Sequence, residues 1–294
     1  MRMRLPLLCA ALIGLVACGS GNNDAATATP PAAATTAAAT APAAPATAPA
    51  PAAASTAAPA AAATAASAPA STASADTDDK RPPAKPFVDD GKWVEGKHYF
   101  RIDPAQPTST PGKIEVTEVF SYGCPACFQF HTVVDELAKS LPKGAVMTYT
   151  PAAFRPDENW PLLQRAYLTA QAFGVDRQSH DAMFDAVFKS GELGIMDQQT
   201  GKPKAQAAWP TIDDVAKFYA KFGVKAEEFV GTANSFTINT KMKRADELIR
   251  AYEVDSTPTL VVNGKYRLTP ITAGGYPQAV ELTQWLVSKE AAGK

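Results

Sequence analysis

Between Ala25 and Ala75 the chain has no charged residue, no aromatic ring and no Leu, Ile, Val or Met; it consists only of Ala, Pro, Thr and Ser. Such a stretch buries too little apolar surface to offset the entropy that the chain loses on folding, so it does not form a domain. We interpret it as an extended tether that reaches at most ~3.1 Å per residue. Residues 87–294 remain, which is enough for one well-buried core.

The chain also has no excess of positive charge. It contains 28 Lys and Arg against 29 Asp and Glu, so its formal net charge is −1. No basic cluster offers a footprint for phosphate groups, and we expect no nucleic-acid partner.

The apolar run at the start of the chain, Leu5–Ala17, is too short to cross a bilayer as a helix. Because Arg2 and Arg4 precede it, it suits the apolar region of a secretory signal. We therefore expect residues 1–17 to be a signal peptide and residues 18–86 to be a linker.

The run ends in Leu15-Val16-Ala17-Cys18-Gly19, which resembles the lipobox of bacterial lipoproteins. In that family the matching cysteine, here Cys18, is diacylated and becomes the first residue after cleavage. Two acyl chains anchor a protein stably to a membrane. No Asp follows Cys18, which by the same analogy favours the outer membrane. The alternative is a plain secretory signal with an incidental cysteine.

Cysteine is scarce, with four residues in the whole chain. Cys9 lies in the leader and Cys18 at the expected lipidation position, so only Cys124 and Cys127 remain for the folded domain. One pair does not make a disulfide-stapled scaffold of a domain this size.

The C-x-x-C spacing of Cys124 and Cys127 serves three known chemistries. Haem attachment requires His directly after the second Cys, and Phe128 stands there instead. A structural zinc site needs four ligands, and a complete set is not evident. The candidates for completing it are His98, His131 and His180. We expect no metal and no cofactor, and the surroundings favour the third chemistry, thiol–disulfide exchange.

The residues around the pair predict a strand followed by a helix. Residues 114–121 are rich in β-branched side chains, and Pro125 has the fixed φ suited to the first turn of a helix. An apolar stripe follows at helical spacing, formed by Cys127, Phe130, Val134, Leu137 and Leu141. Cys124 is thus placed at a helix N-terminus, where unpaired N–H groups stabilise a thiolate. We expect its sulfur to be exposed and the Cys127 sulfur to lie beneath it.

With these features the chain resembles the DsbA family of thiol oxidases from the bacterial cell envelope. The resemblance rests on EVFSYGCPACFQF at 118–130 and VDSTPTLVVNGKY at 254–266, and it covers roughly residues 95–290. It implies an α/β fold, namely a thioredoxin fold with an inserted helical subdomain at about 155–250. It also implies catalytic roles for Cys124 and Cys127.

In the family a cis-proline near the end of the domain faces the active-site sulfurs, and Pro258 matches it. From the residues alone, an ordinary trans loop proline is the alternative. Asn263-Gly264 is a strong type I′ turn signal, so residues 259–262 and 265–269 are predicted to form a hairpin. By the same resemblance, substrate is expected to contact Pro125, Ala126 and Thr257.

Segments with helical periodicity lie between the two motifs, at 159–173, 181–189, 215–222 and 238–252. Thr211 to Asp214 resembles a capping box that opens the third of them. Residues 191–210 lack clear periodicity, and we expect an exposed loop there.

Glu118 shares strand parity with Val116 and Phe120, so it is a candidate for a buried acid beneath the cysteines. The family has a buried acid there that is thought to move a proton during exchange; an acid on a solvated strand face is the alternative. We interpret His131 as a structural or surface residue.

Two residues depart from the best-known member of the family, which has His where this chain has Ala126 and Lys near the position of Tyr149. The imidazole is held to stabilise the nucleophilic thiolate. Its absence leaves the strength of oxidation open, but not the exchange chemistry.

We therefore expect a membrane-tethered thiol:disulfide oxidoreductase in the bacterial periplasm. Its substrates are exported envelope proteins with free thiols, and its resemblance implies a DsbB-like membrane protein that reoxidises it. Two alternatives remain. The first is a disulfide reductase or isomerase of the same fold, and the second is a non-catalytic metal-binding or structural lipoprotein.

Overall fold

The computed structural model describes residues 81–294, which belong to one compact unit. The expected signal peptide, Cys18 and most of the expected tether lie outside the described residues. Among the helices that the structure does describe, none is long and apolar enough to cross a membrane.

The centre of the domain is a five-stranded sheet with the strand order β1-β5-β4-β2-β3. The strands are β1 (Phe100–Arg101), β2 (Ile114–Phe120), β3 (Ala145–Pro151), β4 (Thr259–Val262) and β5 (Tyr266–Leu268). β2 runs parallel to β3 and antiparallel to β4, so it is the central strand. Six of its seven residues are fully buried, which explains its richness in β-branched residues.

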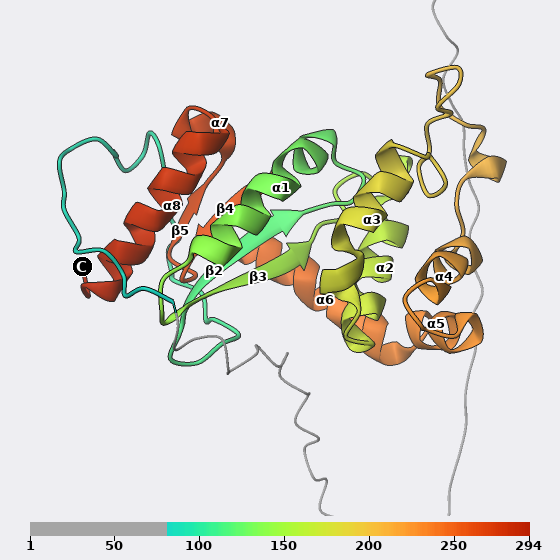
Figure 1. Cartoon of the computed structure of the whole chain (residues 1–294), viewed down its shortest axis with the longest axis horizontal. Helices are drawn as coiled ribbons and strands as arrows, with labels where there is room; N and C mark the ends of the chain where they lie inside the picture. Colours follow the sequence, from blue (N-terminus) through green and yellow to red (C-terminus); the bar gives the residue numbers. More distant parts are fainter. Residues whose placement is uncertain (1–80) are drawn as a thin grey trace, which may run out of the picture. The chain divides into compact units, whose positions relative to one another are not determined.

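Helices cover both faces of the sheet. One face, which carries Val116 and Leu260, packs against α1 (Pro125–Ser140) and α8 (Tyr276–Ala291). The other face, which carries Val119 and Val261, packs against the C-terminal end of α6 (Phe236–Ala251). This layering is the α/β arrangement that the resemblance implied (Figure 1).

The helical subdomain lies between β3 and β4 in the sequence, within the range expected for the insertion. It comprises α2 (Trp160–Ala172), α3 (Asp176–Phe188), α4 (Ile212–Ala220), α5 (Ala226–Ala233) and α6. Figure 1 shows α2 to α5 grouped on one side of the sheet. The short helices are 3-10 turns at Pro156–Glu158 and Gln206–Ala208, and α7 (Pro270–Ala273).

Several sequence predictions of local structure are confirmed. The capping box is present, with the Thr211 hydroxyl 2.8 Å from the Asp214 carboxylate. Asn263 and Gly264 both have positive φ, 53° and 64°, as a type I′ turn requires. Other predictions were incomplete, because α3 begins five residues before the expected start at 181, and α5 and α8 were not predicted.

The described chain already contacts the domain at its first residues, before the expected linker boundary at 86. Arg81 Nη1 donates to the carbonyl of Ala145, at 2.9 Å. Further along, Trp285 Nε1 donates to the carbonyl of Val88, at 2.8 Å. Arg81 thus lies near the C-terminal end of α1, at the opposite end of that helix from Cys124.

Candidate active site

Cys124 is the N-cap of α1, directly after the turn that ends β2. Its φ and ψ of −89° and 116° are extended, and its sulfur accepts a hydrogen bond from the backbone N–H of Cys127 at 3.2 Å. Pro125 follows as the first residue of the helix, where its missing N–H costs nothing. The sequence prediction of a cysteine at a helix N-terminus is confirmed.

The loop before β4 covers the Cys124 sulfur. Cys124 Sγ lies 3.4 Å from the carbonyl oxygen of Thr257, and the Thr257–Pro258 peptide bond is cis, as expected. The sulfur of Cys124 was predicted to be exposed, and that was wrong: the residue is only 4% exposed. The cause is this loop, which lies more than 130 positions away in the chain.

The two cysteines are unpaired thiols in this structure, and their surroundings shift their acidities in opposite directions. The pKa of Cys124 falls from 9.0 to about 6, chiefly because the Cys127 thiol donates a hydrogen bond to it, with help from backbone N–H groups. Burial and the neighbouring sulfur raise the pKa of Cys127 well above its usual value. At neutral pH the pair therefore carries its negative charge on Cys124.

Glu118 lies on β2, on the same side of the strand as Val116, and is 1% exposed. The alternative of an acid on a solvated face is therefore wrong. Burial, together with the nearby charges of Cys124 and Asp135, raises its pKa from 4.5 to about 8. At neutral pH Glu118 is protonated in large part, so it carries a proton close to the thiol pair.

The helical subdomain supports the turn between β2 and α1. The Tyr122 hydroxyl lies 2.9 Å from His180 Nδ1 on α3, and both side chains are buried. Burial lowers the pKa of His180 to about 3, so its ring is neutral. A Cβ at Gly123 would lie 2.6 Å from Trp160 Nε1 on α2, so this position has no room for a side chain. Sequence reasoning missed His180 and Trp160 as supports of the site, because only the fold brings them to it.

Ala126 and Tyr149, the two departures from the best-known member of the family, contact residues of different helices, α8 and α3. The Ala126 carbonyl accepts a hydrogen bond from the Tyr276 hydroxyl on α8, at 3.4 Å. Tyr149 is half-buried, and the guanidinium of Arg177 lies 4.9 Å from the centre of its ring. Tyr276 was not among the predicted site residues.

The three histidines do not gather around the cysteines. His131 is buried, contacts the carbonyl of Phe128 and lies 3.9 Å from the Asp181 carboxylate, consistent with a structural role. His98 packs against Trp93. Within residues 81–294 no group of three or more His, Cys, Asp or Glu is arranged to hold a metal ion.

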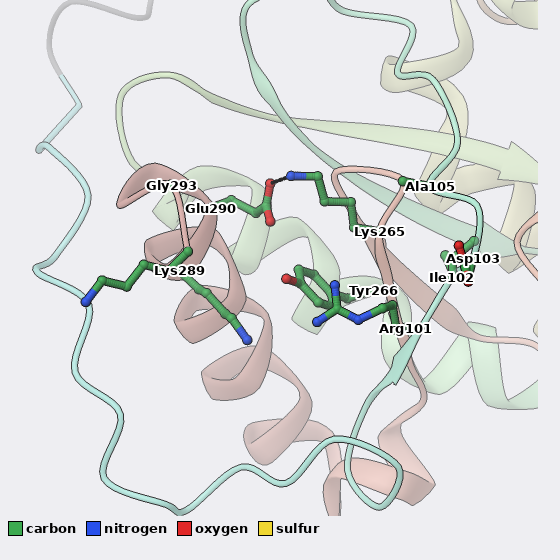
Figure 2. Close-up of a pocket in the computed structure, with 10 residues that line it drawn as sticks. Arg101, Ile102, Asp103, Ala105, Lys265, Tyr266, Lys289, Glu290 and Gly293 are labelled. Atoms are coloured by element: carbon green, nitrogen blue, oxygen red, sulfur yellow. Dashed lines mark hydrogen bonds and ion pairs between the residues drawn. The ribbon is translucent and has the colours of Figure 1, made fainter.

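One cavity lies beside Lys265 and Tyr266 at the β4–β5 turn (Figure 2), which is the end of the sheet away from the cysteines. It has a volume of about 520 Å³ and lies between β1, the β4–β5 turn and the C-terminal end of α8. Figure 2 shows its ion pair between Lys265 and Glu290, with Arg101 and Tyr266 on the facing wall. Neither cysteine lines it, so we do not place the reaction there.

Comparison with known proteins identifies relatives over the described domain. The family model described as Thioredoxin matches residues 109–281. The chain is 36% identical over 200 residues to the thiol:disulfide interchange protein DsbA of Pseudomonas aeruginosa, covering 68% of this chain and 87% of that protein. For DsbA of Azotobacter vinelandii the identity is 32% over 199 residues, with coverage of 68% and 85%.

Solved structures give the same result. The crystal structure of Pseudomonas aeruginosa DsbA superposes with a TM-score of 0.59 at 34% identity, covering 69% of this chain and 97% of that one. The oxidoreductase DsbA from Xylella fastidiosa superposes with a TM-score of 0.60 at 32% identity, covering 68% and 98%. The predicted thioredoxin fold with a helical insertion is confirmed.

The shifted pKa of Cys124 leads to a first prediction. In the reduced protein the ultraviolet absorbance of thiolate should rise with a midpoint near pH 6, and Cys124→Ser should abolish this step. Because the pKa is lower in the folded than in the unfolded state, the reduced form should gain stability over the oxidised form as the pH rises from 6 to 9. Alkylation that modifies Cys127 before Cys124 would contradict the assignment.

The raised pKa of Glu118 leads to a second prediction. Its folded-state pKa lies above the unfolded one, so the acid destabilises the fold as the pH rises from 4.5 to about 8. Glu118→Gln should therefore raise the free energy of unfolding by about 2–3 kcal/mol at pH 7 and by little at pH 4, as measured in urea.

Glu115 on the same strand provides the control for this measurement. Its carboxylate accepts hydrogen bonds from the Ser109 backbone N–H at 3.0 Å and from the Thr110 hydroxyl at 2.7 Å. Glu115→Gln should destabilise the fold at pH 7, because these donors lose a charged acceptor. Equal effects of the two substitutions would show that the burial of Glu118 imposes no electrostatic cost.

Proposed function

The chain belongs to the DsbA family of thiol:disulfide interchange proteins, and on this basis we propose that it introduces disulfides into exported proteins of the bacterial cell envelope. Its activity is that of a thiol:disulfide oxidoreductase. The observation that carries the proposed direction is the low pKa of Cys124 beside the high pKa of Cys127. A stabilised thiolate favours the reduced pair, and an enzyme whose reduced form is favoured gives up its disulfide readily.

The reaction begins with the Cys124–Cys127 disulfide. A substrate thiolate attacks the Cys124 sulfur, a substrate–Cys124 disulfide forms, and the Cys124–Cys127 bond breaks. Cys127 leaves as a thiolate whose high pKa makes it take up a proton, and protonated Glu118 is our candidate donor. Glu118 then regains a proton from solvent.

The second step releases the product. A second substrate thiolate attacks the substrate sulfur of the mixed disulfide, which forms the substrate disulfide and displaces Cys124 as a thiolate. The low pKa of Cys124 makes it a good leaving group. Two electrons have then passed from two substrate thiols to the enzyme pair, and the enzyme is reduced.

We assign substrate binding to the loop that covers the sulfur. The Thr257 carbonyl lies 3.4 Å from Cys124 Sγ, so a chain that pairs with this loop as an added strand brings its own cysteine to the reacting atom. Pro258 keeps this loop free of a backbone donor at its own position. Pro125 is exposed and Ala126 is half-buried, so both are available to contact the substrate from the side of α1.

The remaining parts of the proposal concern location and partners. The reduced pair needs an oxidant, for which we propose a DsbB-like membrane protein that passes the electrons to quinone. Diacylated Cys18 would hold the protein on the periplasmic side of a membrane, with the outer membrane favoured. Arg81 contacts the domain at the C-terminal end of α1, which is about 24 Å long, whereas Cys124 lies at its N-terminal end.

The redox equilibrium of the pair tests the proposed direction. Equilibrated with reduced and oxidised glutathione, a donor of disulfides should show a reduction potential above about −200 mV, because its thiolate is stabilised. A value near about −270 mV would identify a reductase instead. Cys127→Ser, which cannot form the internal disulfide, is the control.

The lipid anchor is tested separately. Cys18→Ser should abolish labelling of the protein with radioactive palmitate and move it from the membrane fraction to the soluble fraction, because the acylated residue is lost. Cys124→Ser should leave the membrane fraction unchanged. An unmodified protein that is processed normally yet found in the soluble fraction would rule out the anchor.

A further inference from the structure

We propose that a pocket on the reverse side of the Thr257–Pro258 loop binds a lysine or arginine side chain directly adjacent to the reacting cysteine of the substrate. The proposal deepens the function given above and rests on it. It assigns a specificity site to residues that take no part in the exchange chemistry.

The pocket has a volume of about 330 Å³. It lies at the end of the sheet where β2 leads into the turn before Cys124 and where β4 begins with Thr259. Asp255, Ser256 and Thr259, which flank the loop, form one wall. Glu253 and Ile271 also line it. Thr257 thus contacts the Cys124 sulfur, while its neighbours Asp255, Ser256 and Thr259 line the pocket.

The pocket opens on the face of the sheet that is turned away from α1. Along β4, Leu260 packs on the face covered by α1 and α8, whereas Val261 packs on the opposite face. Thr259 shares the parity of Val261, so it points to the opposite face. On β5, Arg267 lies between Tyr266 and Leu268, which both pack on the α1 face, and so it points the same way as Thr259.

An extended substrate reaches both sites with neighbouring residues. Successive side chains of a strand point to opposite faces of the sheet. When the substrate cysteine points toward Cys124 on the α1 face, the residues immediately before and after it point to the face that holds the pocket. Residues two positions away point toward α1 again and cannot enter it.

The chemistry of the pocket fits a long cationic side chain. It holds two carboxylates, those of Glu253 and Asp255. Glu253 pairs with Arg267 at 3.1 Å, while Asp255 forms no ion pair with any residue between 81 and 294. The two carboxylates and the one guanidinium of the pocket therefore leave one uncompensated negative charge, on Asp255.

The apolar walls suit the stem of the same side chain. Ile271 is 91% exposed at the rim, and Phe100 lies across the pocket beneath Arg267. Lysine and arginine cover such surfaces with their methylene groups while the charged end stays near water and carboxylates. A glutamate in the same place would meet Asp255 at close range.

The test uses reduced peptides with two cysteines and the oxidised full-length protein. The peptides differ only at the residue next to the first cysteine, which is Lys, Gln or Glu, and a second series varies the residue two positions away. In the adjacent series kcat/KM should fall in the order Lys, Gln, Glu, with about a three- to tenfold span at low salt. About 0.5 M salt should compress the span, because the site is open to solvent.

Asp255→Asn should reduce the span to less than about twofold, because it removes the uncompensated charge while keeping the shape of the side chain. Glu227→Gln, the same kind of change at an exposed acid of α5, should leave the span intact. A span equally large two positions from the cysteine, or one insensitive to Asp255→Asn, would overturn the subsite. Oxidation of all peptides at one rate would overturn the subsite and leave the proposed function standing, whereas failure to oxidise any of them would overturn both.

Discussion

The hydrogen bonding of the Cys124 sulfur at the start of α1 is the interaction on which the site depends. The sulfur has its place because β2, buried on both faces, ends in a turn that leads directly into the helix. The Cys127 thiol and the N–H groups of the first turn then favour a charged Cys124. The turn requires glycine at position 123, because the Trp160 ring occupies the space that a side chain at this position would fill.

The remaining groups of the site are arranged around that one charge. Cys127 and Glu118 are both buried and both kept protonated, so the negative charge has a single place to reside at neutral pH. The Tyr122–His180 contact adds no charge, because the buried imidazole is neutral. The burial of Glu118 thus lowers the free energy of unfolding at neutral pH, but it also keeps a proton near the sulfurs.

The sequence predicted the parts of this arrangement that depend on neighbours in the chain. The strand, the turn and the helix around Cys124 are coded within 27 residues (114–140), and Asn263-Gly264 predicts its own hairpin. The burial of Cys124 was not predictable in this way, because it depends on Thr257, and neither were the contacts of His180 and Trp160. Strand parity correctly placed Glu118 on the same face of β2 as Val116, and that face is buried under α1 and α8.

The pairing of β2 with β4 also determines where this chain tolerates changes in length. Val119 is paired with Thr259, so Cys124 lies five residues after one member of this pair and Pro258 lies directly before the other. An insertion of one residue in either strand would turn every following side chain to the other face and carry Thr257 away from the sulfur. The irregular stretch from Gly191 to Pro210 has no such pairing with β2 or β4. Insertions and deletions among relatives should accordingly collect there and spare the two strands.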